Sequence, residues 1–197
     1  MKQLKIKDIM TTGAFAALYF MCVGLGTLIG IFFDKSGNML YAPAFAAVLG
    51  ATVYYLLIAK LQKFGPVTLL GVIMGLFFFL TGHFFAAMFP ALIFGVLADV
   101  VASLGKYRSK TMNIISYCIF SFVNSGPIIL MWVVKDAYVK SLLARGKDMA
   151  YIERVMYDFT LGHVSWFVAT VVLGAIVGSL FAHQLIKKHF ITSGMLS

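Results

Sequence analysis

The stretch that decides the fold is residues 10–33, MTTGAFAALYFMCVGLGTLIGIFF, which holds 24 residues and no charged side chain. A helix crosses the roughly 30 Å apolar core of a bilayer with about 20 apolar residues, so this stretch is long enough to span it. The basic segment MKQLKIK precedes it, as in a signal peptide, but the apolar run exceeds the short core of a cleaved signal. We therefore predict that residues 10–33 form the first membrane span of the mature protein.

The composition of the whole chain also indicates an integral membrane protein. Of its 197 residues, 61% are hydrophobic and 12% are charged, and the mean hydropathy is +0.96. Soluble domains have about 45–50% apolar and about 25% charged residues, so this chain has too little polar surface for a water-soluble globule. The net charge of +9 lies in short clusters between apolar stretches, which favours contact with anionic membrane lipid and argues against nucleic-acid binding.

Further apolar stretches extend the pattern to a bundle. We predict an all-α membrane domain over residues 1–197 with six spans, at 10–33, 40–61, 66–80, 84–104, 112–134 and 159–186. The third is short, and only Thr81-Gly82-His83 separates it from the fourth, so a five-span alternative stays open. Residues 135–158 are too charged to span, and their spacing predicts two short amphipathic extracellular helices, broken at Arg145-Gly146. This segment is either a lid or a solvated loop, and residues 34–38 are a second candidate gate.

The basic residues predict the orientation of the bundle. If the N-terminus is cytoplasmic, ten of the 16 Lys and Arg residues fall in inner segments and six in outer ones. The outer six are nearly balanced by five acidic residues, whereas cytoplasmic loops carry the excess of Lys and Arg. We therefore expect both termini in the cytoplasm of a cell whose plasma membrane the chain crosses.

The motifs of common enzymes are missing from the sequence. It holds no Walker A loop, no GxSxG, no HExxH and no CxxC, and Cys22 and Cys118 both fall within apolar runs. We expect neither enzymatic activity nor a cofactor or metal of the chain's own. Asp99 is the one acidic residue inside a predicted span. It is either a structural ion pair or helix-end contact near Lys106 and Arg108, or a coupling site, because ionisable groups within a membrane are often functional.

Polar and aromatic residues gather in the predicted outer half of the bundle. A small organic ligand suits an apolar site with a few directed polar groups, so we take these as candidate ligand-binding residues: Tyr41, His83, Asn124, Trp132, His163 and Trp166. The aromatic members have a second interpretation, because Trp and Tyr gather at membrane interfaces in any case. His83 and His163 are also candidate axial ligands of a haem iron, with haem as a substrate.

Small residues recur at four-residue spacing, which lets helix backbones approach closely in lipid. The pairs are Gly13/Ala17, Gly26/Gly30, Ala47/Ala51, Gly71/Gly75 and Gly174/Gly178. Each pair either packs inside the bundle or meets a partner protein. Gly13 and Ala17, at the predicted cytoplasmic end of the first span, are the best candidates for a partner-docking face.

The chain resembles the substrate-binding S component of energy-coupling factor (ECF) transporters over nearly its whole length. That family typically carries an Ala-x-x-x-Ala face on its first helix, and here Gly13 and Ala17 occupy those two positions. Residues 98–101 (ADVV), 105–109 (GKYRS) and 116–117 (SY) look like the Trep_Strep (MptD-like) subgroup.

The resemblance implies a mechanism and partners. An S component captures a vitamin, a vitamin precursor or haem from outside. It then docks on a T component that two ATPase subunits drive, and it topples in the membrane to release the ligand inside. Two other classes stay open: a self-sufficient secondary carrier, against which the lack of an internal repeat argues, and a membrane scaffold that binds no ligand.

Overall fold

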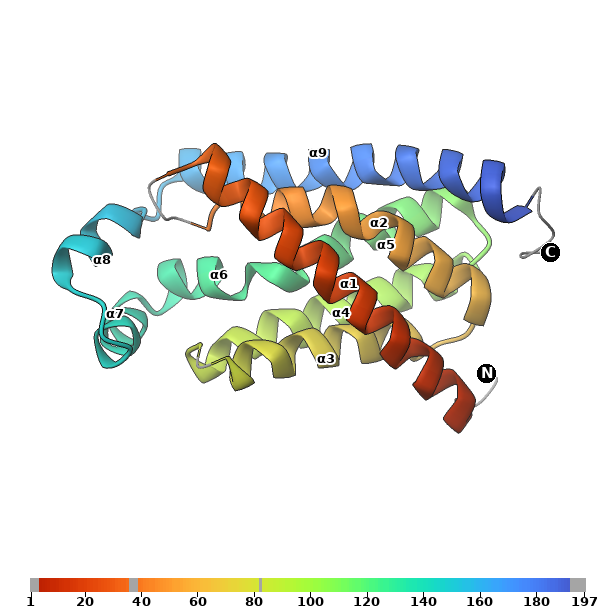
Figure 1. The fold of residues 1–197 in the computed structure, drawn as a ribbon, viewed down its shortest axis with the longest axis horizontal. Helices are drawn as coiled ribbons and strands as arrows, with labels where there is room; N and C mark the ends of the chain where they lie inside the picture. Colours follow the sequence, from red (N-terminus) through yellow and green to blue (C-terminus); the bar gives the residue numbers. More distant parts are fainter. Residues whose placement is uncertain (1–3, 36–38, 82, 192–197) are drawn as a thin grey trace.

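The computed structural model describes residues 4–35, 39–81 and 83–191, and the described chain is a bundle of helices without strands (Figure 1). Its elements in chain order are α1 (Ile6–Phe33), α2 (Ala42–Leu61), α3 (Pro66–Leu80), η1 (Phe85–Ala87), α4 (Met88–Leu104), α5 (Lys110–Phe120), η2 (Ser121–Ser125), α6 (Gly126–Val133), α7 (Lys135–Ala144), α8 (Met149–Val155), α9 (Leu161–Leu185) and η3 (Ile186–Ile191). The predicted all-α membrane bundle is confirmed. Residues 36–38 of the second candidate gate lie outside the described residues.

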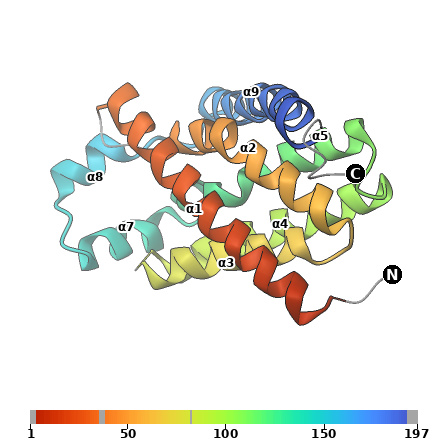
Figure 2. The same cartoon turned by 45° about the vertical axis from the view of Figure 1, so that its right-hand side comes forward.

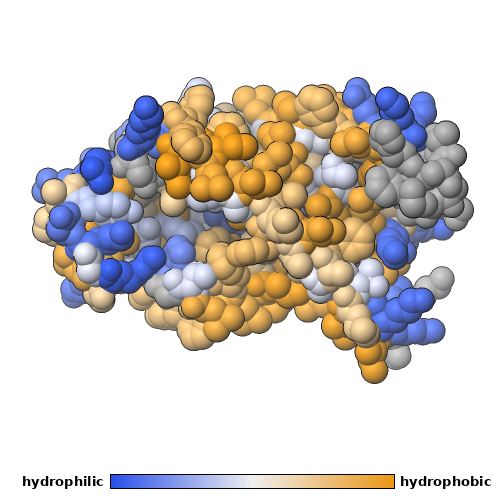
Figure 3. Space-filling view, viewed as in Figure 1, coloured by the Kyte–Doolittle hydropathy of each residue, from blue (hydrophilic) through white to orange (hydrophobic). Residues whose placement is uncertain are grey.

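Among the described residues, five helical segments are long and apolar enough to cross a bilayer: Ile6–Phe33, Ala42–Leu61, Phe85–Leu104, Lys110–Val133 and Leu161–Lys188. The remaining apolar helix, α3, has 15 residues and is therefore only about 22 Å long. Hydrophobic side chains cover the middle of the visible face, and hydrophilic residues lie at both ends (Figure 3). This distribution is the one that a bilayer around the middle of the bundle requires.

The predicted fifth span, residues 112–134, is a broken helix. It consists of α5, the 3-10 segment η2 and α6. Pro127 has no N–H to donate, and its ring clashes with the carbonyl four residues earlier in a regular helix. A Cβ added at Gly126 would also overlap the Ala87 carbonyl oxygen, so only glycine lets the chain pass η1 this closely. The break places Asn124 and its neighbours inside the bundle, where irregular backbone is tolerated.

Most of the small-residue pairs pack helices together inside the bundle. A Cβ added at Gly26 would lie 2.5 Å from the Ala46 nitrogen, so α1 and α2 touch backbone to backbone. Gly174 and Gly178 bring α9 equally close to carbonyl oxygens of α2. Gly71 meets Gly95 between α3 and α4. These pairs therefore have the internal packing role.

The two ends of the bundle differ. α1 begins and α9 ends at one end, whereas α7 and α8 cover the opposite end (Figures 1 and 2). The segment 135–158 thus contains two short helices, and Arg145 and Gly146 lie between them. Leu142, Ile152 and Val155 are buried against the bundle, while the charged side chains of the segment are exposed. The orientation of these ends relative to the cell stays a prediction.

Candidate functional site

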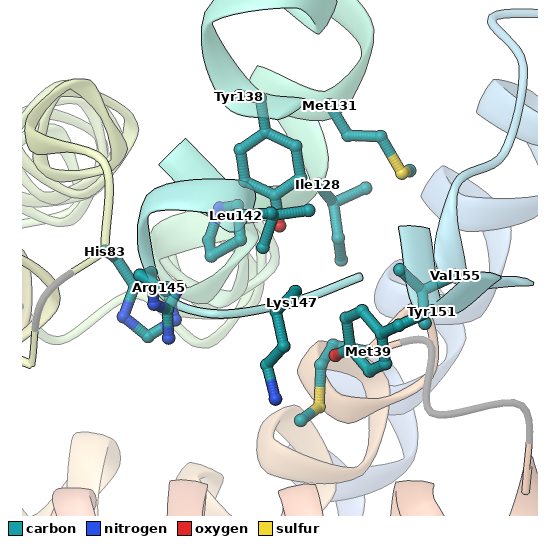
Figure 4. A pocket seen from close by; sticks show the side chains of 11 residues that line it. Met39, His83, Ile128, Met131, Tyr138, Leu142, Arg145, Lys147, Tyr151 and Val155 are labelled. Atoms are coloured by element: carbon teal, nitrogen blue, oxygen red, sulfur yellow. The ribbon is translucent and has the colours of Figure 1, made fainter. Parts of the chain in front are cut away.

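Two adjoining cavities lie in the half of the bundle that α7 and α8 cover. The rim cavity, of about 130 Å³, lies beneath these two short helices and is lined by residues of α6, α7, α8 and the turn between α7 and α8 (Figure 4). The inner cavity, of about 150 Å³, extends between α1, α2, α3 and the broken fifth span. Four residues line both cavities and join them into one site: Met39, His83, Pro127 and Ile128.

A basic turn forms one wall of the rim cavity. α7 ends at Ala144, the Gly146 N–H donates to the Leu143 carbonyl, and the Lys147 N–H donates to the Leu142 carbonyl. This pattern is a Schellman motif, and it requires the left-handed conformation that Gly146 adopts with φ of 78°. The motif places Arg145 and Lys147 on either side of the glycine, and both side chains line the cavity.

His83 stands where the two cavities meet. Its Nδ1 lies 3.0 Å from the Thr81 hydroxyl, and its ring packs edge-on against Phe78. Burial lowers the pKa of His83 below its ordinary value, and the positive charge of Arg145 lowers it further. The imidazole is therefore neutral at pH 7, when one ring nitrogen donates a hydrogen bond and the other accepts one.

Asn124 lies on the wall of the inner cavity. Its side chain is 8% exposed, and its Nδ2 donates to the Tyr19 hydroxyl of α1 across 3.1 Å. Its Oδ1 has no hydrogen-bond partner among the described residues. A buried polar atom without a partner costs about 1–3 kcal/mol, which a ligand or a water in the cavity would offset. The Asn124 amide is thus placed to receive a donor group of a ligand.

The other candidate histidine lies outside these cavities. His163 is near the start of α9, where its Nδ1 lies 2.8 Å from the Asp158 carbonyl oxygen and its ring packs against Tyr157. It lines neither cavity, so the structure does not bring His83 and His163 together. No group of three or more metal-binding side chains occurs in the described part of the chain.

The candidate tryptophans hold the ends of helices together. Trp132 donates from Nε1 to the Tyr157 carbonyl across 3.2 Å. Trp166, which is 55% exposed, donates to the Tyr41 hydroxyl across 3.2 Å. None of these three candidates lines either cavity. These bonds attach the end of α6 to the connection between α8 and α9, and the start of α9 to the residue before α2.

At the other end of the bundle, Asp99 receives four hydrogen bonds. Its Oδ2 accepts from the Gly65 N–H at 2.8 Å and from the N–H and hydroxyl of Thr68, each at 2.9 Å. Its Oδ1 accepts from the Tyr107 hydroxyl at 2.8 Å. The carboxylate thus caps the N-terminus of α3, and it forms no salt bridge within the described residues. Of the two interpretations of Asp99, these contacts match the helix-end contact.

Comparison with known protein families supplies one clear match. The model of Trep_Strep, described as a hypothetical bacterial integral membrane protein, matches residues 6–191. The chain belongs to the Trep_Strep family. Searches of curated proteins and of solved structures found no match. The family description, together with the apolar helices, confirms that the chain is an integral membrane protein of a bacterium.

In this Trep_Strep protein, Gly13 and Ala17 face away from the bundle. Both are exposed on α1, and a Cβ added at Gly13 would meet no atom of the described chain within 4 Å. On the face of the same helix that packs against the bundle, Thr12, Ala16 and Tyr19 are buried. Gly13 and Ala17 are thus free of the packing role that the inward pairs have.

Sequence reasoning missed several residues that line the site of this Trep_Strep protein. They come from α1, the α1–α2 loop, α3, α7, α8 and the turn between α7 and α8, and include Thr27, Met39, Phe77, Tyr138, Lys147 and Tyr151. The sequence Arg145-Gly146-Lys147 held a signal, because a glycine after a helical run marks a C-terminal cap and fixes the residues beside it. The apolar members carry no such signal.

Proposed function

We propose that this protein is the substrate-binding S component of an ECF-type importer, which captures a small organic nutrient. One combination carries the proposal: a largely apolar cavity with a few polar groups lies at one end of the bundle, and an exposed small-residue face, where Gly13 meets no other part of the described chain, lies toward the other. The cavity supplies capture, and the face supplies a surface for a partner helix. In this proposal two partner ATPase subunits hydrolyse ATP, and the T component transmits their conformational change to this protein.

The arrangement of the cavity suits capture from outside the cell. α7 and α8 cover the rim cavity through a small set of buried side chains, namely Leu142, Ile152 and Val155. The two cavities are smaller than the roughly 300–1,000 Å³ of ordinary small-molecule sites, so a nutrient enters when this cover moves. In the proposed cycle, α7 and α8 act as a lid that closes over the nutrient before the protein docks.

The exposed face of α1 suits docking. Gly13 and Ala17 lie one turn apart, and a helix from another protein can approach their backbone closely. Inside this bundle, Gly26 and Gly174 allow the same kind of approach to α2. A partner helix from the T component is the proposed occupant of the face.

Co-purification with the T component and the ATPase subunits tests the proposal. Ala17→Trp places a large ring on the proposed face and is expected to reduce recovery of the partner subunits at least fivefold. Ala169→Trp is the matched control, because Ala169 is also exposed but lies on α9. Equal recovery with both variants, or no recovery with the wild-type chain, contradicts the proposal.

The haem version of the proposal rests on one candidate ligand only. His83 lines both cavities, whereas His163 lies elsewhere, so a single axial imidazole is available from the two candidates. Haem addition to the purified protein tests this version, because an axial His83 produces a Soret band that His83→Gln shifts or abolishes. An identical spectrum with the variant excludes haem ligation by His83.

A self-sufficient secondary carrier is the second candidate. Carriers coupled to ions or protons place ionisable groups in the membrane, and the buried Asp99 is the group that favours this class. The donors of its four hydrogen bonds, however, all lie at the N-terminus of α3 or in the turn after α4. Nutrient uptake by liposomes that contain this chain alone would support the carrier and contradict the S component.

A further inference from the structure

The polar groups of the two cavities are arranged asymmetrically, and the asymmetry specifies a class of ligand. Resting on the proposed function, we infer that the site selects an amphipathic anion: a carboxylate, phosphate or sulfonate joined to a non-polar body. The anionic group lies at the basic turn of the rim cavity, and the non-polar body extends past Ile128 into the inner cavity. Asn124 receives a donor group on that body.

The first step of the argument is the charge balance of the rim cavity. Arg145 and Lys147 both line it, and no Asp or Glu is among its described lining residues (Figure 4). Neither cation forms a salt bridge within the described residues. Asp148 follows Lys147 directly, but its carboxylate caps α8 by accepting the Tyr151 N–H at 2.7 Å. The positive charge at this wall is therefore available to an anion.

The second step is the fixed position of these cations. The Schellman motif at the end of α7 sets the backbone on both sides of Gly146, so the backbone of Arg145 and Lys147 is held beside the cavity that both side chains line. Lys147 also lies over the Tyr151 ring, 4.6 Å from its centroid, which keeps its ammonium at the cavity wall. A preorganised pair of cations loses less conformational entropy on binding an anion.

The third step is the change of character from rim to interior. No Lys or Arg is among the described residues that line the inner cavity: side chains such as Val23, Pro43 and Phe77 line it, with Thr27, His83 and Asn124 as the polar members. An ion without a non-polar body would leave this space unfilled. The buried Oδ1 of Asn124, without a partner among the described residues, favours a body that carries an N–H or O–H group.

A pair of fluorescent probes tests the charge preference. The protein is reconstituted in phosphatidylcholine nanodiscs and titrated with 8-anilino-1-naphthalenesulfonate and with its uncharged parent, N-phenyl-1-naphthylamine. Arg145→Gln/Lys147→Gln is expected to weaken binding of the sulfonate about fivefold and to leave the uncharged parent within about twofold, since exposed ion pairs contribute modestly. Lys140→Gln/Arg154→Gln, which removes two exposed charges of the same segment that line neither cavity, is expected to change neither.

Three outcomes would overturn the inference. The first is equal weakening of sulfonate binding by both double variants, which would assign the effect to general surface charge. The second is a wild-type protein that binds the uncharged parent as tightly as the sulfonate. The third is loss of the difference between the wild type and Arg145→Gln/Lys147→Gln when phosphatidylglycerol is added to the nanodiscs, because a lipid headgroup would then occupy the turn.

The probe titration and the co-purification together separate this inference from the proposed function. Probe binding needs no partner subunit, whereas the S-component proposal stands or falls on co-purification. If the partner subunits co-purify but the probes show no charge preference, the amphipathic-anion inference is wrong and the S-component proposal stands. If the probes show the charge preference but no partner subunits co-purify, the S-component proposal is wrong and the preference of the site for an anion stands.

Discussion

The side-chain amide of Asn124 donates a hydrogen bond to the hydroxyl of Tyr19 across 3.1 Å. This bond joins the wall of the inner cavity to α1, the helix whose opposite face carries Gly13 and Ala17. Tyr19 is fully buried and its ring packs edge-on against Phe120. Asn124 and the proposed docking helix are therefore linked through one direct contact.

Tyr19→Phe removes the hydroxyl and keeps the ring. We expect a loss of about 1 kcal/mol in the free energy of unfolding, because the Asn124 amide then has no protein partner. Thermal unfolding in detergent measures the change, and Tyr151→Phe on α8 serves as a control, because Tyr151 is only half-buried. An unchanged unfolding temperature for Tyr19→Phe would show that water satisfies Asn124 equally well.

Gly26→Ala is expected to destabilise the protein by about 1–3 kcal/mol, because the added methyl group would lie 2.5 Å from the Ala46 nitrogen and force α1 away from α2. Gly13→Ala, on the exposed face of the same helix, adds a methyl group to open space and is expected to be neutral or slightly stabilising. Thermal unfolding of the two variants, side by side, checks the assignment of inward and outward faces. Equal effects would mean that α1 is rotated from its described position.

Asp99→Asn keeps the shape of the side chain and replaces one acceptor oxygen by an NH₂ group. Because the carboxylate accepts four hydrogen bonds, we expect the variant to lose about 1–3 kcal/mol of stability. Sulfonate-probe affinity should stay within about twofold, since Asp99 lines neither cavity. Stability like that of the wild type, with uptake that no longer depends on pH, would instead identify Asp99 as a coupling group.

His83 predicts a dependence of stability on pH. Its pKa is lowered from 6.5 in the folded protein, so the unfolded chain binds the proton more readily as the pH falls. The contribution of neutral His83 to stability is present above pH 6.5 and is lost as the pH decreases toward the folded-state value. Thermal unfolding at pH 7.5 and pH 5 should therefore show a larger decrease for the wild type than for His83→Gln. The same decrease in both proteins would place the titrating group elsewhere.

The membrane bundle followed from local sequence, and the composition of the site followed only in part. Residues 10–33 predict a span because length and apolar character are properties of the stretch itself. A proline such as Pro127 is a local sign of a broken helix, but the position of the 3-10 segment depends on how closely Gly126 approaches η1. Such an approach is a tertiary contact, and no local pattern encodes it.

Some of the candidate binding residues line the cavities and others do not, and tertiary contacts again decide which. His83 and Asn124 line the cavities because a loop and a helix break place polar groups inside the bundle. Trp132 and His163 instead form hydrogen bonds with the backbone carbonyls of residues 157 and 158. These bonds depend on the path of the chain after α8. Arg145 and Lys147 belong to a segment whose charges resemble those of any solvated loop. Their convergence on one cavity depends on how α7 and α8 fold back over α6.

The shortness of α3 has a consequence for the surrounding lipid. A helix of 15 residues covers about 22 Å, whereas acyl chains fill about 30 Å, so the bilayer must thin beside α3 or the ends of that helix must sink into hydrocarbon. Either response strains the lipid on one side of the molecule only. A helix that is shorter than the hydrocarbon layer is accommodated mainly by thinning of the bilayer beside it, so the lipid next to α3 is expected to be thinner than the lipid around the longer helices.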